Sequence, residues 1–160
     1  MLKWKHTQTN IKCLGRMILN SKHFGWFETD EKQIIIVTSV SIMVFEHNDD
    51  LLEYLNIVKT PDIDAAHYAR LNVMDDWIST LRGLTYSDRE DAEDGLIYFR
   101  DREDQKRYYF DNKLFLPILK AKKSNYIFDI RAFGNSHGAF IVDITNPVGE
   151  LCCVILGVRG

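Results

Sequence analysis

The sequence is short of the features that identify a compartment directly. It has only three cysteines in 160 residues, Cys13 and the adjacent pair Cys152 and Cys153. An odd set without regular spacing is not a disulfide framework of the kind found in small secreted domains. The longest strongly apolar tract, residues 34–45, is too short to span a bilayer, and residues 1–10 lack the apolar stretch of a signal peptide. These absences predict a soluble, cytoplasmic protein of a reducing compartment, and they leave open secretion by a route that needs no leader.

Several catalytic signatures are missing as well. The sequence has no phosphate-binding P-loop, no G-x-G-x-x-G fingerprint and no HExxH, and no two histidines stand four residues apart. His137 lies in the stretch GNSHG, residues 134–138, which we interpret as a turn between strands. Ser136 beside it is not expected to form a nucleophile–base pair with its immediate neighbour. We therefore expect no enzymatic activity, no metal and no cofactor.

The composition is that of one folded domain. Apolar residues make up 46% of the chain and aromatic residues 12%, which excludes disorder of the whole chain. A chain of this length can bury about 70% of the surface that its unfolded form exposes. The sequence shows no linker, so we predict a single domain over residues 1–160.

Strand-forming residues dominate the segment before the first clear helix signal. The pattern predicts a hairpin of residues 16–20 and 23–29. Residues 32–46 are rich in Ile and Val, and are expected to form a strand that bends or splits near Ser39. Residues 10–19 also fit helical spacing, so a helix stays an alternative there.

Two helices are expected next. Asn48 is a predicted N-cap for a helix over residues 49–58. Residues 60–62 read Thr-Pro-Asp and predict the start of a second helix, which Gly83 ends. The apolar stripe of that second helix consists of Leu71, Met74, Ile78 and Leu81, with Trp77 beside them.

Strand patterns return after an acidic stretch. We expect a hairpin of residues 95–100 and 105–110, an edge strand or break at Pro117 in residues 113–120, and three strands over residues 125–133, 139–145 and 151–158. Cys152 and Cys153 are predicted to be buried in the last of these strands. The fold class is therefore α+β: a mainly antiparallel sheet with two helices between an N-terminal and a C-terminal set of strands.

The charge is unevenly distributed along the chain. Residues 46–111 hold 17 Asp or Glu and 8 Lys or Arg, whereas the rest of the chain holds 6 and 12. Residues 88–94 read DREDAED, and the tetrapeptide DRED returns at residues 101–104. Such a segment disfavours direct binding to nucleic acid or to an anionic membrane, and favours a basic protein partner. The alternative is that the carboxylates only solvate helix and turn surfaces.

Metal sites are weaker hypotheses for the same acids. Neither register of DREDAED places the glycine and glutamate that a calcium loop needs at its sixth and twelfth positions. A magnesium-dependent nuclease of the PD-(D/E)xK type would use Asp62, Asp104 and Lys106. However, Pro61-Asp62 is better explained as a helix start, and Asp104 and Lys106 as part of a hairpin tip.

Tyrosines lie among these acids and complete the predicted binding surface. Tyrosine gives contact area at low entropy cost, and carboxylates steer a basic partner. The predicted partner-binding residues are Asp88, Glu90, Asp91, Glu93, Asp94, Asp101, Glu103 and Asp104, with Tyr98 and Tyr108 as anchors.

In size, charge and layout, the chain resembles the immunity proteins of bacterial contact-dependent inhibition and related polymorphic toxin systems. The resemblance implies a cytoplasmic inhibitor that binds one cognate basic toxin domain, often a nuclease, and blocks its active site. Three alternatives stay open: a phage-encoded inhibitor of a host defence complex, a metal-dependent hydrolase with an unrecognised carboxylate site, and a subunit of a larger assembly.

Overall fold

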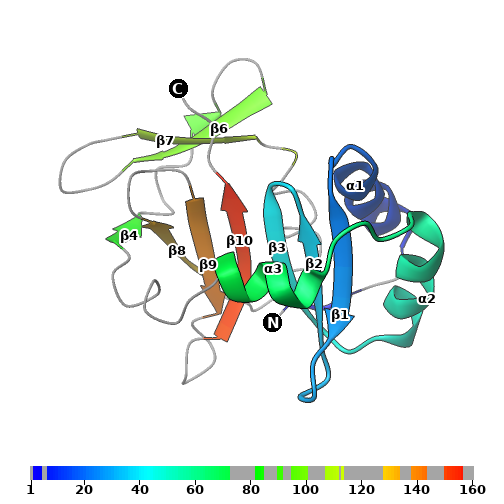
Figure 1. Ribbon diagram of the computed structural model, residues 1–160. Helices are drawn as coiled ribbons and strands as arrows, with labels where there is room; N and C mark the ends of the chain where they lie inside the picture. Colours follow the sequence, from blue (N-terminus) through cyan, green and yellow to red (C-terminus); the bar gives the residue numbers. More distant parts are fainter. Residues whose placement is uncertain are drawn as a thin grey trace.

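The protein folds as a large and a small antiparallel sheet, with helices packed on the large sheet (Figure 1). The computed structural model describes residues 2–4, 7–72, 82–84, 90–91, 95–100, 107–111, 113, 128–133, 138–143 and 150–156. The helices are α1 (Gln8–Leu19), α2 (Asp49–Val58) and α3 (Ala65–Asn72). The large sheet has the order β1 (Phe24–Glu28), β2 (Gln33–Thr38), β3 (Ser41–Glu46), β10 (Glu150–Leu156), β9 (Gly138–Asp143), β8 (Phe128–Phe133) and β4 (Arg82–Leu84). The small sheet has the order β5 (Glu90–Asp91), β6 (Leu96–Arg100) and β7 (Arg107–Asp111).

The α+β class predicted from the sequence is confirmed. Every pair of named strands is antiparallel, and α2 and α3 lie between the N-terminal and the C-terminal sets of strands. The sheet joins these two sets directly, because β3 from the first set pairs with β10 from the second. The ends of the described chain therefore meet in the middle of the large sheet.

One expected strand is instead a helix. Residues 16–20 were predicted to pair with residues 23–29, but they form the C-terminal end of α1 and its cap. The side chain of Thr7 accepts a hydrogen bond from the amide of Asn10 and caps this helix. Leu14, Met17 and Ile18 are all buried, at the spacing of one helical face. The helical periodicity therefore outweighs the local strand propensity of this segment.

The long strand predicted for residues 32–46 splits close to Ser39, as expected. Its halves, β2 and β3, pair as a tight hairpin. The hydroxyl of Thr38 accepts hydrogen bonds from the amides of Val40 and Ser41 and closes the turn. A Thr–Ser pair in an apolar run thus marks the turn, because these hydroxyls can satisfy the backbone groups that the turn leaves free.

The β2–β3 hairpin is buried on both faces. Ile34, Ile36, Met43 and Phe45 share one face and belong to the core that includes residues of α1 and α2. Val37, Ile42 and Val44 have the opposite orientation in the pleat and are buried as well. We call these the α1–α2 face and the α3 face. Burial on both faces explains why the sequence here is continuously apolar rather than alternating.

Helix α3 approaches the α3 face closely at Gly25. A Cβ atom on Gly25 would come within 2.9 Å of the backbone oxygen of Ile63 and 3.1 Å of the Cβ of Ala65. Figure 1 shows α3 crossing over the strands at this end of the sheet. A glycine at this position in β1 therefore allows the start of α3 to pack directly on the strand.

Of the two predicted helix starts, the first is confirmed and the second is wrong. Asn48 caps α2 as predicted, because its side chain accepts a hydrogen bond from the amide of Leu51. The second helix was predicted to begin at residues 60–62, but α3 begins at Ala65. Asp64 accepts the amide hydrogen of His67 and so takes the capping role. The residue expected there, Asp62, is instead bonded to β1.

The predicted end of the second helix is also wrong. Gly83 lies in β4, where it pairs with Arg131 of β8. The stretch 73–81, which holds most of the expected apolar stripe, is outside the described residues, and so is the predicted strand or break around Pro117. None of the described helices is long and apolar enough to cross a membrane.

The C-terminal strands form where the sequence predicted them. β8, β9 and β10 pair in sequence order, with a register shift between Leu151 and Cys153. Cys152 and Cys153 are fully buried, which confirms their predicted place in the core. Burial raises the pKa of the Cys153 thiol well above its ordinary value. This side chain is therefore a protonated apolar group rather than a reactive thiolate.

The N-terminal segment completes the pairing of β3. β10 pairs with residues 41–43 of β3, and Leu2 forms an isolated bridge farther along, at Phe45. The amide of Leu2 donates to the carbonyl of Val44 and its carbonyl accepts from the amide of Glu46. Leu2 is fully buried. It thus occupies the side of β3 that β10 leaves unpaired beyond its register shift.

Among the described residues, Phe110 joins the small sheet to the main core. The predicted hairpin of residues 95–100 and 105–110 is present as β6 and β7, with Ile97 opposite Phe110. Phe110 is fully buried and belongs to the same cluster as Phe45 and Cys153. Strand β7 is therefore attached to the main core through Phe110.

Truncation of Phe110 is expected to be strongly destabilising. We predict that Phe110→Ala lowers the free energy of unfolding by about 3–5 kcal/mol, because it removes a buried ring and leaves a cavity. Urea unfolding followed by circular dichroism measures this change. Ile57→Ala is the control, since Ile57 is 77% exposed and its truncation should change the free energy by no more than about 0.5 kcal/mol. Equal effects of the two substitutions would show that Phe110 does not anchor the sheet.

Candidate functional site

The structure places four of the ten predicted partner-binding residues on the small sheet. Glu90 and Asp91 form β5, Tyr98 lies in β6 and Tyr108 in β7. The other six are outside the described residues: Asp88, Glu93, Asp94, Asp101, Glu103 and Asp104. The strand register of the small sheet therefore shows where Glu90 and Asp91 lie relative to the end of β6.

In this register, β5 begins and β6 ends at the same end of the small sheet. β5 runs antiparallel to β6, with Glu90 opposite Tyr98 and Asp91 opposite Ile97. The chain therefore enters β5 at the end of the sheet where β6 finishes at Arg100. The first copy, residues 88–91, runs into β5 at that end, and the second copy, residues 101–104, follows directly after β6.

The structure describes the side chain of Tyr98, whereas for Tyr108 it describes only the place in the strand register. Tyr98 is only 7% exposed, and its ring lies 5.6 Å from that of Tyr109, its cross-strand neighbour. In this arrangement Tyr98 is a packing residue, and a role as an anchor would require its ring to leave the protein interior. Tyr108 lies opposite Phe99 in the β6–β7 pair.

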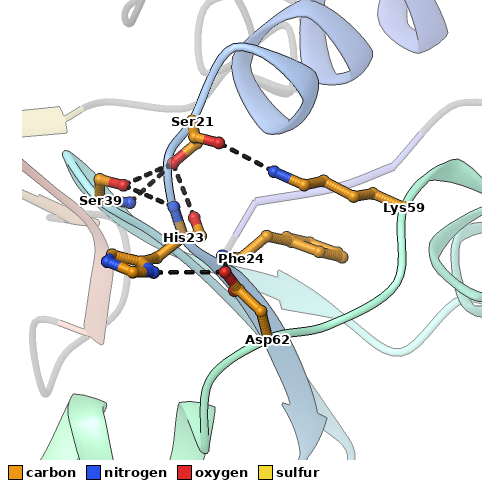
Figure 2. Close-up of polar contacts among 6 residues, drawn as sticks. All are labelled: Ser21, His23, Phe24, Ser39, Lys59 and Asp62. Atoms are coloured by element: carbon orange, nitrogen blue, oxygen red, sulfur yellow. Dashed lines mark hydrogen bonds and ion pairs between the residues drawn. The ribbon is translucent and has the colours of Figure 1, made fainter.

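A polar cluster that the sequence did not predict lies among the connections of the N-terminal half of the chain. It consists of Ser21, His23, Ser39, Lys59 and Asp62 (Figure 2). These residues come from three connections: α1 to β1, β2 to β3, and α2 to α3. We call this group the polar cluster. Its contacts span up to 39 positions in the sequence, and no local motif connects its members.

Asp62 is the centre of the polar cluster. Its Oδ1 accepts the amide hydrogen of Phe24 at 2.7 Å, and its own amide donates to the Phe24 carbonyl at 2.9 Å. Its Oδ2 lies 3.2 Å from Nδ1 of His23. The Phe24 amide, and to a lesser degree His23 and Lys59, hold the pKa of Asp62 below its ordinary value. Asp62 thus binds β1 as a carboxylate.

The two serines fasten the neighbouring loops to each other. The amide of Ser39 donates to Oγ of Ser21, the amide of His23 donates to Oγ of Ser39, and both distances are 2.8 Å. The hydroxyl of Ser21 donates to the carbonyl of His23 at 2.7 Å. The ammonium group of Lys59 donates to the carbonyl of Ser21 at 2.8 Å. These bonds mainly satisfy backbone groups that would otherwise lack partners.

The cluster has the composition of a serine hydrolase triad but a different geometry. In a triad, the imidazole oriented by the carboxylate must face the nucleophilic hydroxyl. Asp62 does face Nδ1 of His23, but the Ser21 and Ser39 hydroxyls are bonded to backbone groups and to each other, 2.9 Å apart. Among the described contacts, no hydroxyl meets the other nitrogen of His23. In this arrangement the two serine hydroxyls join loops.

A second Ser-containing pattern also lacks its structural context. Residues 134–138, GNSHG, fit the spacing G-x-S-x-G, which in hydrolases forms a sharp turn from a strand into a helix. Here the chain leaves β8 before this stretch and enters the antiparallel strand β9 at Gly138. The connection therefore joins two strands of a hairpin, as the sequence interpretation of a turn required.

The described carboxylates do not gather around a metal position. His47 contacts two of them, with Nδ1 2.9 Å from Glu28 and Nε2 3.0 Å from Asp49, but these nitrogens point to opposite sides of the ring. Within the described ranges, no group of three or more His, Cys, Asp or Glu residues could hold an ion. Asp62, a predicted ligand in the nuclease alternative, is bonded to Phe24 and His23. Asp104 and Lys106 lie outside the described residues.

Comparison of the chain with protein-family models, curated proteins and solved structures returned no match.

The role of Asp62 predicts a defined pH dependence of stability. Because its pKa is lowered by folding, the carboxylate stabilises the folded state above the ordinary Asp value of about 3.9. This contribution is lost as the pH falls through the lower, folded value. Asp62→Asn resembles the protonated form. We expect the wild type to be more stable than this variant at pH 6, and the difference to disappear towards pH 2–3.

Urea unfolding of both proteins across this pH range tests the prediction. Asp30→Asn is a matched control, because it removes one carboxylate from the exposed β1–β2 turn by the same chemical change. A wild-type advantage over Asp62→Asn that stays constant down to pH 2 would contradict the assigned role. So would an advantage that the Asp30→Asn comparison reproduces in full.

Proposed function

We propose that this chain is a protein-binding inhibitor that uses its acidic segment, residues 88–104, to bind a basic partner. The observation that carries the proposal is the register of the small sheet. In the small sheet, β5 begins and β6 ends at the same end, and the two DRED copies connect to the strands there. Each copy carries three carboxylates and one arginine, a formal charge of −2, and Arg100 stands opposite Arg107 at the same end of the sheet.

The strand register adds a geometric argument to the composition. Acids scattered along a chain only lower its net charge, whereas acids attached at one end of a sheet create a local negative potential. Such a potential can raise the association rate with a basic protein by roughly 10- to 1,000-fold, and this gain weakens as salt is added. The fixed connection of β7 to the core through Phe110 supports a defined location for that potential.

The mechanism that follows is occlusion. A nuclease or other phosphate-binding protein presents lysines and arginines to its substrate, and clustered carboxylates can occupy the same positions. An inhibitor of this kind needs no catalytic group of its own. The proposed partner is a basic toxin domain, and the chain would act as its immunity protein. This specific form rests on size, charge and layout.

The first experiment identifies the partner. Tagged protein is used as bait in a lysate of the native host at low and at high salt, with mass spectrometry as the readout. We expect one stoichiometric basic protein at low salt and its release at high salt. Recovery of a partner whose retention does not depend on salt would contradict electrostatic recognition. So would the absence of a basic partner when a toxin from the same locus is co-expressed.

A matched pair of double variants then tests the assigned surface. Asp101→Asn with Asp104→Asn neutralises two acids of the second DRED copy. Asp50→Asn with Glu53→Gln removes the same charge from exposed positions of α2. We expect the first pair to weaken binding by roughly 2- to 5-fold per carboxylate, mainly through a slower association rate. The second pair should bind almost as the wild type does. Equal losses would assign the effect to net charge alone.

A further inference from the structure

β1 is the outermost strand at one end of the large sheet, and part of its outer side is open. The amide and carbonyl of Phe24 point away from β2 and are both bonded to Asp62. Backbone groups alternate in direction along an antiparallel strand, so those of Trp26 and Glu28 point the same way. No described residue bonds to them. Within the described part of the chain, Asp62 therefore closes the first part of this edge and nothing pairs with the second part.

The free part of the edge is accessible and surrounded by carboxylates. Trp26 and Phe27 are partly exposed, and Glu28 is exposed. Beyond Glu28, the turn to β2 carries Asp30, Glu31 and Lys32, which are all exposed, so the acids exceed the bases there by one in the turn itself.

A second group of acids reaches the same place from α2. His47 contacts Glu28 at 2.9 Å and Asp49 at 3.0 Å, so it joins the end of β1 to the first turn of α2. Asp49 is 94% exposed. The end of β1 thus combines unpaired peptide groups with a local excess of negative charge.

We propose that this edge binds an extended basic segment of a partner protein by strand addition. The added strand would bond to the peptide groups of Trp26 and Glu28. Its residue opposite Glu28 lies on the α1–α2 face, where a Lys or Arg meets Glu28 and comes close to Asp49. Two positions along, opposite Trp26, an Arg can stack on the indole. The recognised sequence therefore has basic residues at alternate positions.

The charges favour this occupant over a second copy of the chain. Pairing of two β1 edges would bring the Glu28, Asp30 and Asp49 carboxylates of one molecule next to those of the other. Like charges close together across a strand pair are destabilising. Asp62 further limits the register, because any added strand must stop before Phe24.

This inference does not rest on the acidic segment at residues 88–104, since every residue that carries it lies between Phe24 and Asp62. The two proposals therefore fail separately. Loss of partner binding on changing Asp101 and Asp104 leaves the β1 edge untouched.

The test uses defined peptides and the full chain. The probe is a capped eight-residue peptide that alternates Arg and Thr, and the control peptide alternates Glu and Thr. We expect the Arg–Thr peptide to shift the amide resonances of Trp26 and Glu28 and to slow their hydrogen exchange. The Glu–Thr peptide should do neither.

Two substitutions of Glu28 distinguish the contribution of its backbone amide to peptide binding from that of its carboxylate. Glu28→Thr keeps the amide and removes the carboxylate, and should weaken peptide binding roughly 2- to 5-fold. Glu28→Pro also removes the amide hydrogen, which faces away from β2, and should abolish the protection of Trp26. If Glu28→Pro disturbs the resonances of β2, the proposal is tested by comparing peptide binding of Glu28→Thr with that of the wild type.

Three results would overturn the proposal. The first is equal binding of both peptides. The second is a set of shifted amides that lies outside β1. The third is protection of Trp26 and Glu28 without peptide that grows with protein concentration, because it would show that a second copy occupies the edge.

Discussion

The structure depends on one constraint: the central hairpin β2–β3 is apolar on both faces and must be covered on both. Helices α1 and α2 supply the cover on the face of Ile36 and Phe45, and α3 lies on the opposite face, against Gly25. Free energy from burial favours each of these contacts, but the geometry of a single sheet decides where the helices can go. The chain must therefore cross from one face to the other after α2, and residues 59–64 make this crossing.

That crossing explains why Asp62 has its particular role. The connection passes the outer side of β1, where peptide groups need partners. Asp62 supplies one donor and one acceptor to Phe24 and thereby postpones the start of α3 to Ala65. A similar solution occurs inside the sheet, where Leu2 bonds to the part of β3 that β10 leaves unpaired. In both places a short, irregular piece of chain completes a strand edge.

Sequence patterns predicted the elements whose signals are local. The cap at Asn48, the split near Ser39 and the three C-terminal strands all follow from residues close together in the chain. The strand predicted for residues 16–20 was wrong. Strand propensity and helical spacing competed there, and burial of Met17 and Ile18 in the tertiary structure favoured the helix. The start of α3 could not be predicted, since it depends on a bond between Asp62 and Phe24, 38 residues apart. The polar cluster was missed for the same reason. For the predicted acidic surface, the described strands show only how β5, β6 and β7 pair with one another.

The distribution of polar groups directs attention to surfaces rather than to a cleft. In the polar cluster, the serine hydroxyls and the Asp62 carboxylate are occupied by loops of the same chain, so the Ser, His and Asp that composition would offer to catalysis are used in folding. At the end of β1 the exposed charges are mainly carboxylates, those of Glu28, Asp30, Glu31 and Asp49, with the cation of Lys32 beside them. A carboxylate without a metal or an adjacent base is a weak catalyst but an effective partner for lysine and arginine. The proposed recognition of a basic partner therefore rests on exposed carboxylates such as Glu28, Asp30 and Asp49.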